Sequence, residues 1–148
     1  MIKIKNILVP TDFSKRFTHT LNYAVEIAKS MKSVLHIIHV IEPIVFSSDI
    51  VVTNLGLDEL PNELEILAKK DFEKITGSLI KKDVKYLTKV LHGTASEEIL
   101  EYAGKNHIDL ICIATHGRGN FENLLFGSTT EKVLRKASCP VLSVRIKE

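Results

Sequence analysis

The chain has 148 residues, the usual size of one domain, and 45% of them are hydrophobic and 26% charged. This composition is typical of a globular protein and excludes a disordered or fibrous chain. A net charge of +2 does not indicate a nucleic-acid partner, and no apolar run is long enough to indicate a membrane span or a signal peptide. The two cysteines form no metal-binding or disulfide pattern, so we expect a cytoplasmic location. From the length we expect a single domain over residues 1–148.

Short apolar runs alternate with helical patterns along the chain. The runs are rich in branched residues and too short for helices, which is typical of buried strands. The strands predicted in this way cover residues 4–9, 34–40, 84–91, 109–114 and 141–146.

Four helices are predicted between these strands. Apolar side chains recur at helical spacing over 17–31 and 64–79. Two more helices are expected to begin at Thr94 and Ser128, because each is followed three residues later by glutamate, the spacing of a capping box. Near-continuous apolar strands separated by helices predict an α/β fold, in which helices cover both faces of a parallel sheet. Residues 42–61 interrupt the alternation, and the sequence leaves open whether they form a surface loop or a lid.

The small and polar residues that follow the first and fourth strands are candidates for a binding site. Ligands of open parallel sheets bind at the carboxyl ends of the strands, where the strand order reverses. The first strand runs into residues 10–14, and the fourth runs into 115–120, which contain two glycines. Residues 127–130 then begin the last helix, whose first N–H groups suit a phosphate. Turn glycines with an ordinary serine cap are the equally compatible alternative.

Common nucleotide motifs do not account for this segment. Residues 117–122 begin like a dinucleotide-binding G-x-G-x-x-G loop but lack its third small residue, and the chain has no G-x-x-x-x-G-K-[ST] loop. Instead, residues 114–117, the nine residues after them, and Gly127-Ser128 resemble the nucleotide loop of the universal stress proteins, which reads G-x-x-G, nine residues, G-[ST]. The opening residues 6–14 and the His39-Val40 pair resemble the same family.

The resemblance covers the chain except residues 42–61, and it implies a fold and a ligand. The fold is a Rossmann-like, doubly wound sheet of five parallel strands in the order 3-2-1-4-5. In the nucleotide-binding branch of the family, ATP with Mg²⁺ or Mn²⁺ lies across the carboxyl ends of strands one and four.

The resemblance also implies roles for single residues. Asp12 would face the ribose or phosphates through metal or water, and the backbone of Val40 would bind adenine. Ala114 departs from the motif, which has glycine there beside the ribose. The expected cofactor-binding residues are Pro10, Thr11, Asp12, Val40, Ala114, Thr115, His116, Gly117, Arg118, Gly119, Asn120, Gly127, Ser128, Thr129 and Thr130.

Three functions are compatible with these residues. The first is a regulatory module of the stress response that binds an adenine nucleotide; the others are a slow ATPase or phosphotransferase, and a dimeric scaffold that binds no nucleotide. We predict no catalytic residues, because the loop offers Arg118, Asp12 and His116 but no lysine cradle and no convincing base.

Several residues have simpler alternative roles. Asp12 could instead cap the first helix or its turn. His36 and His39 are three apart on a strand, so they point to opposite faces and do not chelate one metal. The last strand, 141–146, lies at a sheet edge in the expected order and carries no inward charge, so it predicts a homodimer through that strand. The alternative is that the loop after the second strand, or Lys147-Glu148, covers this edge.

Overall fold

The computed structural model describes residues 1–43, 60–116 and 126–145. In these residues, strands and helices alternate along the chain. The strands are β1 (Asn6–Pro10), β2 (Val34–Ile41), β3 (Lys85–His92), β4 (Leu110–Ala114) and β5 (Val141–Val144). The helices are α1 (Lys15–Met31), α2 (Leu60–Leu79), α3 (Ala95–Lys105) and α4 (Ser128–Lys136). None of these helices is both long and apolar enough to cross a membrane.

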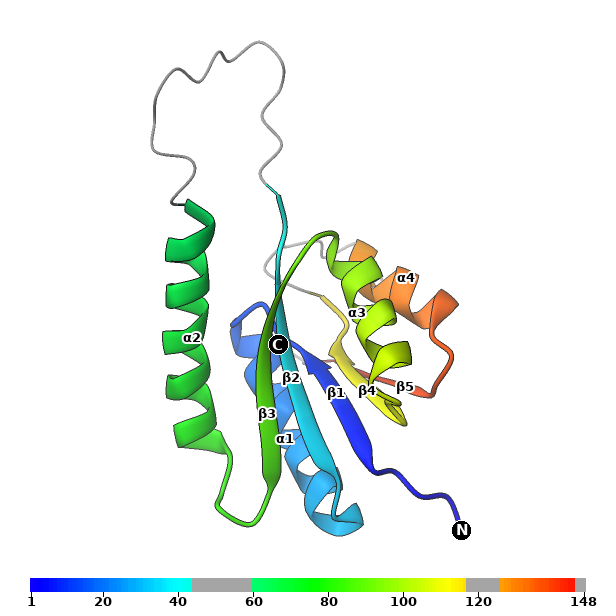
Figure 1. The fold of residues 1–148 in the computed structure, drawn as a ribbon. Coiled ribbons are helices and arrows are strands. Elements are labelled where there is room, and N and C mark those ends of the chain that lie inside the picture. Colours follow the sequence, from blue (N-terminus) through cyan, green and yellow to red (C-terminus); the bar gives the residue numbers. More distant parts are fainter. Residues whose placement is uncertain (44–59, 117–125, 146–148) are drawn as a thin grey trace, which may run out of the picture.

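All neighbouring strands are parallel, and their order is β3-β2-β1-β4-β5. Helices α1 and α2 cover one face of the sheet, and α3 and α4 cover the other (Figure 1). The chain turns from one direction of winding to the other between β1 and β4, so the carboxyl ends of these two strands mark the switch point. The structure therefore confirms the predicted fold and strand order.

Two hydrophobic cores lie on the two sides of the sheet. In β1, Ile7 and Val9 pack with α1 on one side, and Leu8 between them packs on the side of α3 and α4. All three side chains are fully buried, as expected for a central parallel strand. Alternate residues of each central strand thus serve opposite cores, and the sheet is fixed in register from both sides.

The ends of several elements differ from the prediction. β1 begins at Asn6 rather than at residue 4, because pairing with β2 begins where Asn6 lies opposite Val34. β5 ends at Val144, and Arg145 continues without strand structure, while residue 146 lies outside the described residues.

Both predicted capping boxes are also wrong in detail. Thr94 is the N-cap residue of α3, but its side chain makes no capping hydrogen bond. Instead the carboxylate of Glu42 accepts a hydrogen bond from the backbone N–H of Ala95 (2.8 Å). In α4 the N-cap residue is Gly127, and Ser128 is already the first helical residue.

His36 lies under α3 as a buried histidine of the core. Its side chain is 7% exposed, and its Nδ1 lies 3.0 Å from the hydroxyl oxygen of Tyr102. Burial lowers the pKa of His36 from its ordinary value of 6.5, because the charged imidazolium would lose hydration there. The folded protein therefore holds this histidine neutral at pH values at which the unfolded chain protonates it.

This burial predicts that acid weakens the fold. Because the unfolded chain binds the extra proton, the contribution of His36 to the free energy of unfolding is complete above pH 6.5 and is lost as the pH falls through the lowered value. Urea denaturation at pH 7.5 and pH 5.5 measures the loss. In His36→Met the difference between the two pH values should shrink, and an undiminished difference would contradict the assignment.

Candidate functional site

The turn between β1 and α1 is held by side chains that bond to its own backbone. The hydroxyl oxygen of Thr11 accepts from the N–H of Phe13 (2.8 Å), and Oδ1 of Asp12 accepts from the N–H of Ser14 (2.9 Å). Ser14 then caps α1 by accepting from the N–H of Phe17 (3.3 Å). Phe13 lies between them with a φ of 60°, in the left-handed region that a bulky residue rarely adopts. Of the two roles considered for Asp12, the capping of the turn is thus observed for one carboxylate oxygen.

The carboxyl end of β4 is joined directly to the start of α4. The N–H of Gly127 donates to the carbonyl oxygen of Thr115 (2.8 Å), and the hydroxyl of Thr130 donates to the carbonyl oxygen of Ala114 (2.8 Å). The first N–H to bond within the helix is that of Glu131, which donates to Gly127 (2.9 Å). The N–H groups at 128–130 therefore have no acceptor within the helix, as at the start of any α-helix. Gly127 itself uses its N–H within the fold, so it is not one of the donors for an anion.

The end of β2 presents its backbone beside this junction. The carbonyl oxygen of Ile38 accepts from the N–H of Thr11 (2.8 Å), which is the last backbone–backbone hydrogen bond between β2 and the β1 side among the described residues. Peptide groups two residues apart on a strand point to the same edge. The N–H and C=O of Val40 therefore point past the end of β1, into the space above Thr11.

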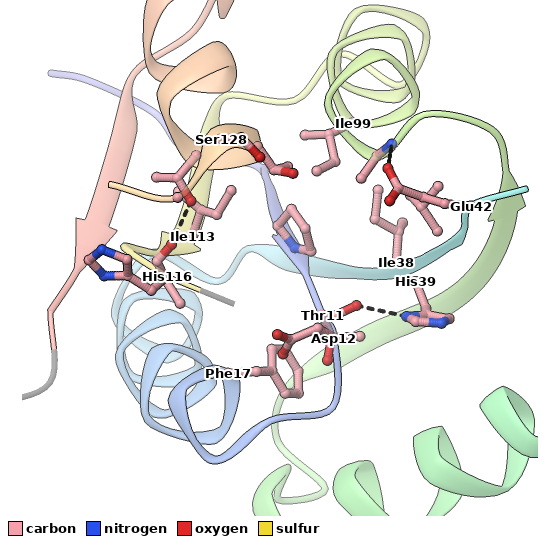
Figure 2. A pocket seen from close by; sticks show the side chains of 17 residues that line it. Thr11, Asp12, Phe17, Ile38, His39, Glu42, Ile99, Ile113, His116 and Ser128 are labelled. Carbon is pink, nitrogen blue, oxygen red and sulfur yellow. Dashed lines mark hydrogen bonds between the residues drawn. The ribbon is translucent and has the colours of Figure 1, made fainter. Parts of the chain in front are cut away.

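A cavity of about 330 Å³ lies between these three segments. Figure 2 shows Ser128 and Ile113 at one side of it and Glu42 at the other, with Ile99 between them. Of the predicted residues, the structure brings together here Pro10, Thr11, Asp12, Val40, Ala114, His116, Gly127, Ser128, Thr129 and Thr130.

The remaining predicted residues are placed differently. Thr115 is buried beside the cavity but does not line it; its backbone bonds to Gly127 and Val144. Residues 117–120, which include Arg118, lie outside the described residues.

Other residues line the cavity without having been predicted. They come from the apolar interior, from the end of β2 and from the start of α3: Phe17, Ile38, His39, Glu42, Ala95, Ile99 and Ile113. The end of β2 was the available signal, because His39 precedes Val40 on this strand and Glu42 follows its last residue, and the carboxyl end of β2 lies beside that of β1.

The charges of the cavity wall are unevenly distributed. Asp12 and Glu42 supply carboxylates, and no lysine or arginine is among the described residues that line it. His39 is held on the opposite side of β2 from Ile38, with Nδ1 2.8 Å from the carbonyl oxygen of Thr11 and its ring 4.7 Å from that of Phe13. His36 and His39 thus face different layers, as predicted. In the described parts of the chain, no three His, Cys, Asp or Glu side chains are grouped closely enough to hold a metal ion by themselves.

The sequence pattern of the Universal stress protein family matches residues 3–145. The chain belongs to this family. Among its relatives, the universal stress protein MJ0577 of Methanocaldococcus jannaschii is 33% identical over 99% of this chain and 98% of its own. The solved structure of MJ0577 has a TM-score of 0.82 and covers 99% of both chains.

Two further structures of universal stress proteins have the same fold. UspA from Lactobacillus plantarum is 25% identical and covers 98% of this chain and 100% of its own, with a TM-score of 0.83. A universal stress protein from Archaeoglobus fulgidus was solved in complex with dAMP. It is 20% identical, has a TM-score of 0.68, and covers 97% of this chain and 98% of its own, so its likeness concerns the fold.

Proposed function

We propose that this universal stress protein binds ATP together with a divalent cation in the cavity between β1, β2 and α4, and acts as a regulatory module of the stress response. The observation that carries the proposal is that one cavity has a helix N-terminus at one side and a strand backbone that matches a base at the other. Its volume of about 330 Å³ falls in the range of roughly 300–1,000 Å³ of small-molecule sites.

The start of α4 would hold the phosphates. The N–H groups at 128–130 have no acceptor in the helix, and they lie at the positive end of the helix dipole. The hydroxyls of Ser128 and Thr129 add donors that can rotate toward an oxygen. An anion with several oxygens, such as a triphosphate, is the ligand that satisfies these groups together.

The backbone of Val40 would bind the base. Adenine offers an acceptor at N1 beside a donor at N6, and a peptide N–H with its neighbouring C=O on a strand edge matches that pair. Ile38 and Ile99 are buried side chains that line the cavity beside this edge. They provide apolar surface against which a planar base can pack. Such a position places the ribose near Ala114 and Asp12.

The residues present fit a divalent cation that arrives with the nucleotide. Mg²⁺ is usually held by one or two carboxylates together with substrate phosphates. Asp12 provides a carboxylate in the cavity wall. Among the described residues, no group of side chains would bind the ion without the phosphates. Bound there, the ion would neutralise phosphate charge that no described lysine or arginine of the wall balances.

The relatives support the same ligand class. The dAMP complex of the Archaeoglobus fulgidus protein shows that a protein with this fold can accommodate an adenine nucleotide. Titration calorimetry with ATP, with and without Mg²⁺, tests the proposal directly, and mass spectrometry of nucleotide released from the purified protein identifies the natural ligand, including AMP. Absence of adenine-nucleotide binding would leave the non-nucleotide scaffold as the function.

Asp12→Asn should change the effect of the metal rather than the fold. The amide keeps an oxygen that can accept from Ser14, but it lacks the charge that attracts a cation. We expect Mg²⁺ to strengthen ATP binding by about tenfold in the wild type and far less in the variant. In EDTA the variant should bind ATP as well as the wild type or better, because a like charge has been removed.

The exposed Asp71 of α2 offers a matched control for this prediction. Asp71→Asn should keep the wild-type dependence on Mg²⁺, because its carboxylate lies outside the cavity wall. An equal gain from Mg²⁺ in Asp12→Asn and the wild type would show that Asp12 does not hold the cation.

A slow ATPase is the second candidate, and the same sample can test it. Phosphoryl transfer needs positive charge on the phosphates and a group that orients the nucleophile. Among the described residues that line the cavity, neither lysine nor arginine is present. We therefore expect turnover far below the roughly 1 to 1,000 per second of ordinary enzymes. Faster hydrolysis that is lost in Asp12→Asn would make the protein an enzyme.

The cellular context follows from the same premises. Both cysteines are free, and burial raises the pKa of the Cys112 thiol to about 12, so it is an inert part of the core. Free cysteines fit the reducing cytoplasm, where we place the protein.

We also propose that it forms a homodimer through β5, the edge strand beside β4.

A further inference from the structure

The starts of two helices line the cavity, and one of them is already occupied by a side chain. Ala95 is the first residue of α3, as Ser128 is of α4, and both line the cavity. The N–H of Ala95 donates to Oε1 of Glu42 (2.8 Å), so a carboxylate from the end of β2 sits at the positive end of α3. This carboxylate repels a phosphate from α3 and leaves α4 as the anion site.

Glu42 also continues the strand edge that would bind the base. Side chains two residues apart on a strand lie on the same face. Continuing β2 one residue beyond Ile41 therefore places the side chains at 38, 40 and 42 on the face toward α3. The bond to Ala95 confirms this direction for Glu42. In Figure 2 its carboxylate lies beside Ile38 and Ile99, on the side of the cavity away from Ser128. The second oxygen of the carboxylate can accept one more hydrogen bond there.

We propose that Glu42 determines the specificity of this pocket for 6-aminopurines, by accepting a hydrogen bond from the exocyclic amino group of the base. The inference rests on the proposed nucleotide site. The amino group of adenine carries two hydrogens; one faces the Watson–Crick edge, where the C=O of Val40 accepts it, and the other faces N7. Glu42, two residues beyond Val40, supplies the acceptor for the second.

A 6-oxopurine places the wrong group against this carboxylate. Hypoxanthine has a carbonyl oxygen where adenine has its amino group, so two acceptors would face each other. The backbone of Val40 contributes to the same preference, because the N1–H of hypoxanthine opposes its N–H. The contribution of Glu42 is therefore measured by the change in preference when this side chain alone is altered.

Glu42→Gln tests the proposal by replacing one hydrogen-bond acceptor, a carboxylate oxygen, with a donor, the amide NH₂ group. The amide oxygen keeps the bond from the N–H of Ala95, which turns the NH₂ group toward the base. This donor matches the carbonyl of hypoxanthine and opposes the amino group of adenine. We expect the ratio of the dissociation constants of ITP and ATP, measured by calorimetry with Mg²⁺, to fall by about tenfold or more.

Glu97→Gln is the matched control, because it removes the same charge from an exposed residue in the first turn of α3 that does not line the cavity. Its ITP-to-ATP ratio should equal that of the wild type. If ATP binds the wild type and Glu42→Gln keeps the wild-type ratio, the role of Glu42 is wrong. If the wild type binds no ATP, the proposed function fails instead. An unchanged melting temperature of Glu42→Gln shows that the link to α3 is preserved.

Discussion

Gly127→Val should abolish measurable ATP binding while the protein stays folded. Gly127 lines the cavity at the start of α4, where a branched side chain would take up space beside the N–H groups at 128–130. Losing several hydrogen bonds to a charged ligand, each worth about 1.5–3 kcal/mol, weakens binding by at least about a hundredfold.

The backbone at Gly127 makes this variant a clean test. Its φ of −68° and ψ of 159° are extended values that valine adopts readily, and its N–H bond to Thr115 does not depend on the side chain. A positive φ is therefore not the reason for a glycine here, and close approach of a ligand is the reason that this variant tests.

Calorimetry measures the affinity, and thermal unfolding shows that the variant is folded. Gly104→Val is the matched control, because a Cβ atom added at Gly104 of α3 meets no described atom within 4 Å beyond its chain neighbours and the backbone of its own helix. It should bind ATP like the wild type. Wild-type affinity for ATP in a folded Gly127→Val protein would show that the phosphates do not bind at the start of α4.

The fold could be predicted because hydrophobic periodicity reports burial directly. β1 and β4 are buried on both faces and read as continuous apolar runs, whereas α1 shows one apolar stripe. The alternation of such runs with helices predicts a parallel sheet. The position of the cavity could be predicted from topology, since the carboxyl ends of β1 and β4 meet at the switch point.

The starts of α3 and α4 were predicted to within one residue, but their capping interactions were not, because partners distant in sequence decide them. The capping-box pattern at Thr94 is local, but Glu42, 53 residues before Ala95, takes the N–H of that residue. At α4 the hydroxyl of Thr130 and the N–H of Gly127 bond to the end of β4, and Gly127 rather than Ser128 is the N-cap residue. A capping-box pattern involves only residues close in sequence, so it does not include these distant hydrogen-bond partners.

The apolar part of the cavity wall was missed for a similar reason. Ile38, Ile99 and Ile113 line the cavity and also belong to the core beneath α3 and α4. In a sequence, an isoleucine that borders a cavity has the same periodicity as one that fills a core. Polar residues after a strand stand out from that pattern, which is why Asp12 and Ser128 could be named.

The outer edge of β5 should pair with a second copy of the chain, and Ser143→Pro should convert the dimer to a monomer. The other edge strand, β3, carries exposed Lys85 and Lys89, which oppose pairing with another chain. β5 reads VLSV and has no charge within it. Two-fold antiparallel pairing would satisfy the edge peptide groups of both copies, in the commonest closed assembly.

The structure identifies which peptide groups serve that edge. The carbonyl oxygens of Pro140 and Val144 accept from Ile111 (3.0 Å) and Thr115 (3.1 Å), so alternate residues of β5 face β4. The peptide groups between them, including that of Ser143, face outward. Proline at 143 removes an outward donor and is tolerated in an edge strand, whereas proline at 144 would remove a donor from the sheet itself.

Sedimentation velocity at micromolar concentration distinguishes the two states. The wild type and Ser143→Ala, which keeps the N–H group, should sediment as dimers, and Ser143→Pro should sediment as a monomer. All three should retain ATP binding, because β5 contributes no residue to the cavity wall among those described. A wild-type protein that sediments as a monomer would exclude the dimer. A dimer that persists in a folded Ser143→Pro protein would move the interface away from this strand, since one fewer donor on each copy interrupts an antiparallel ladder at two symmetric places.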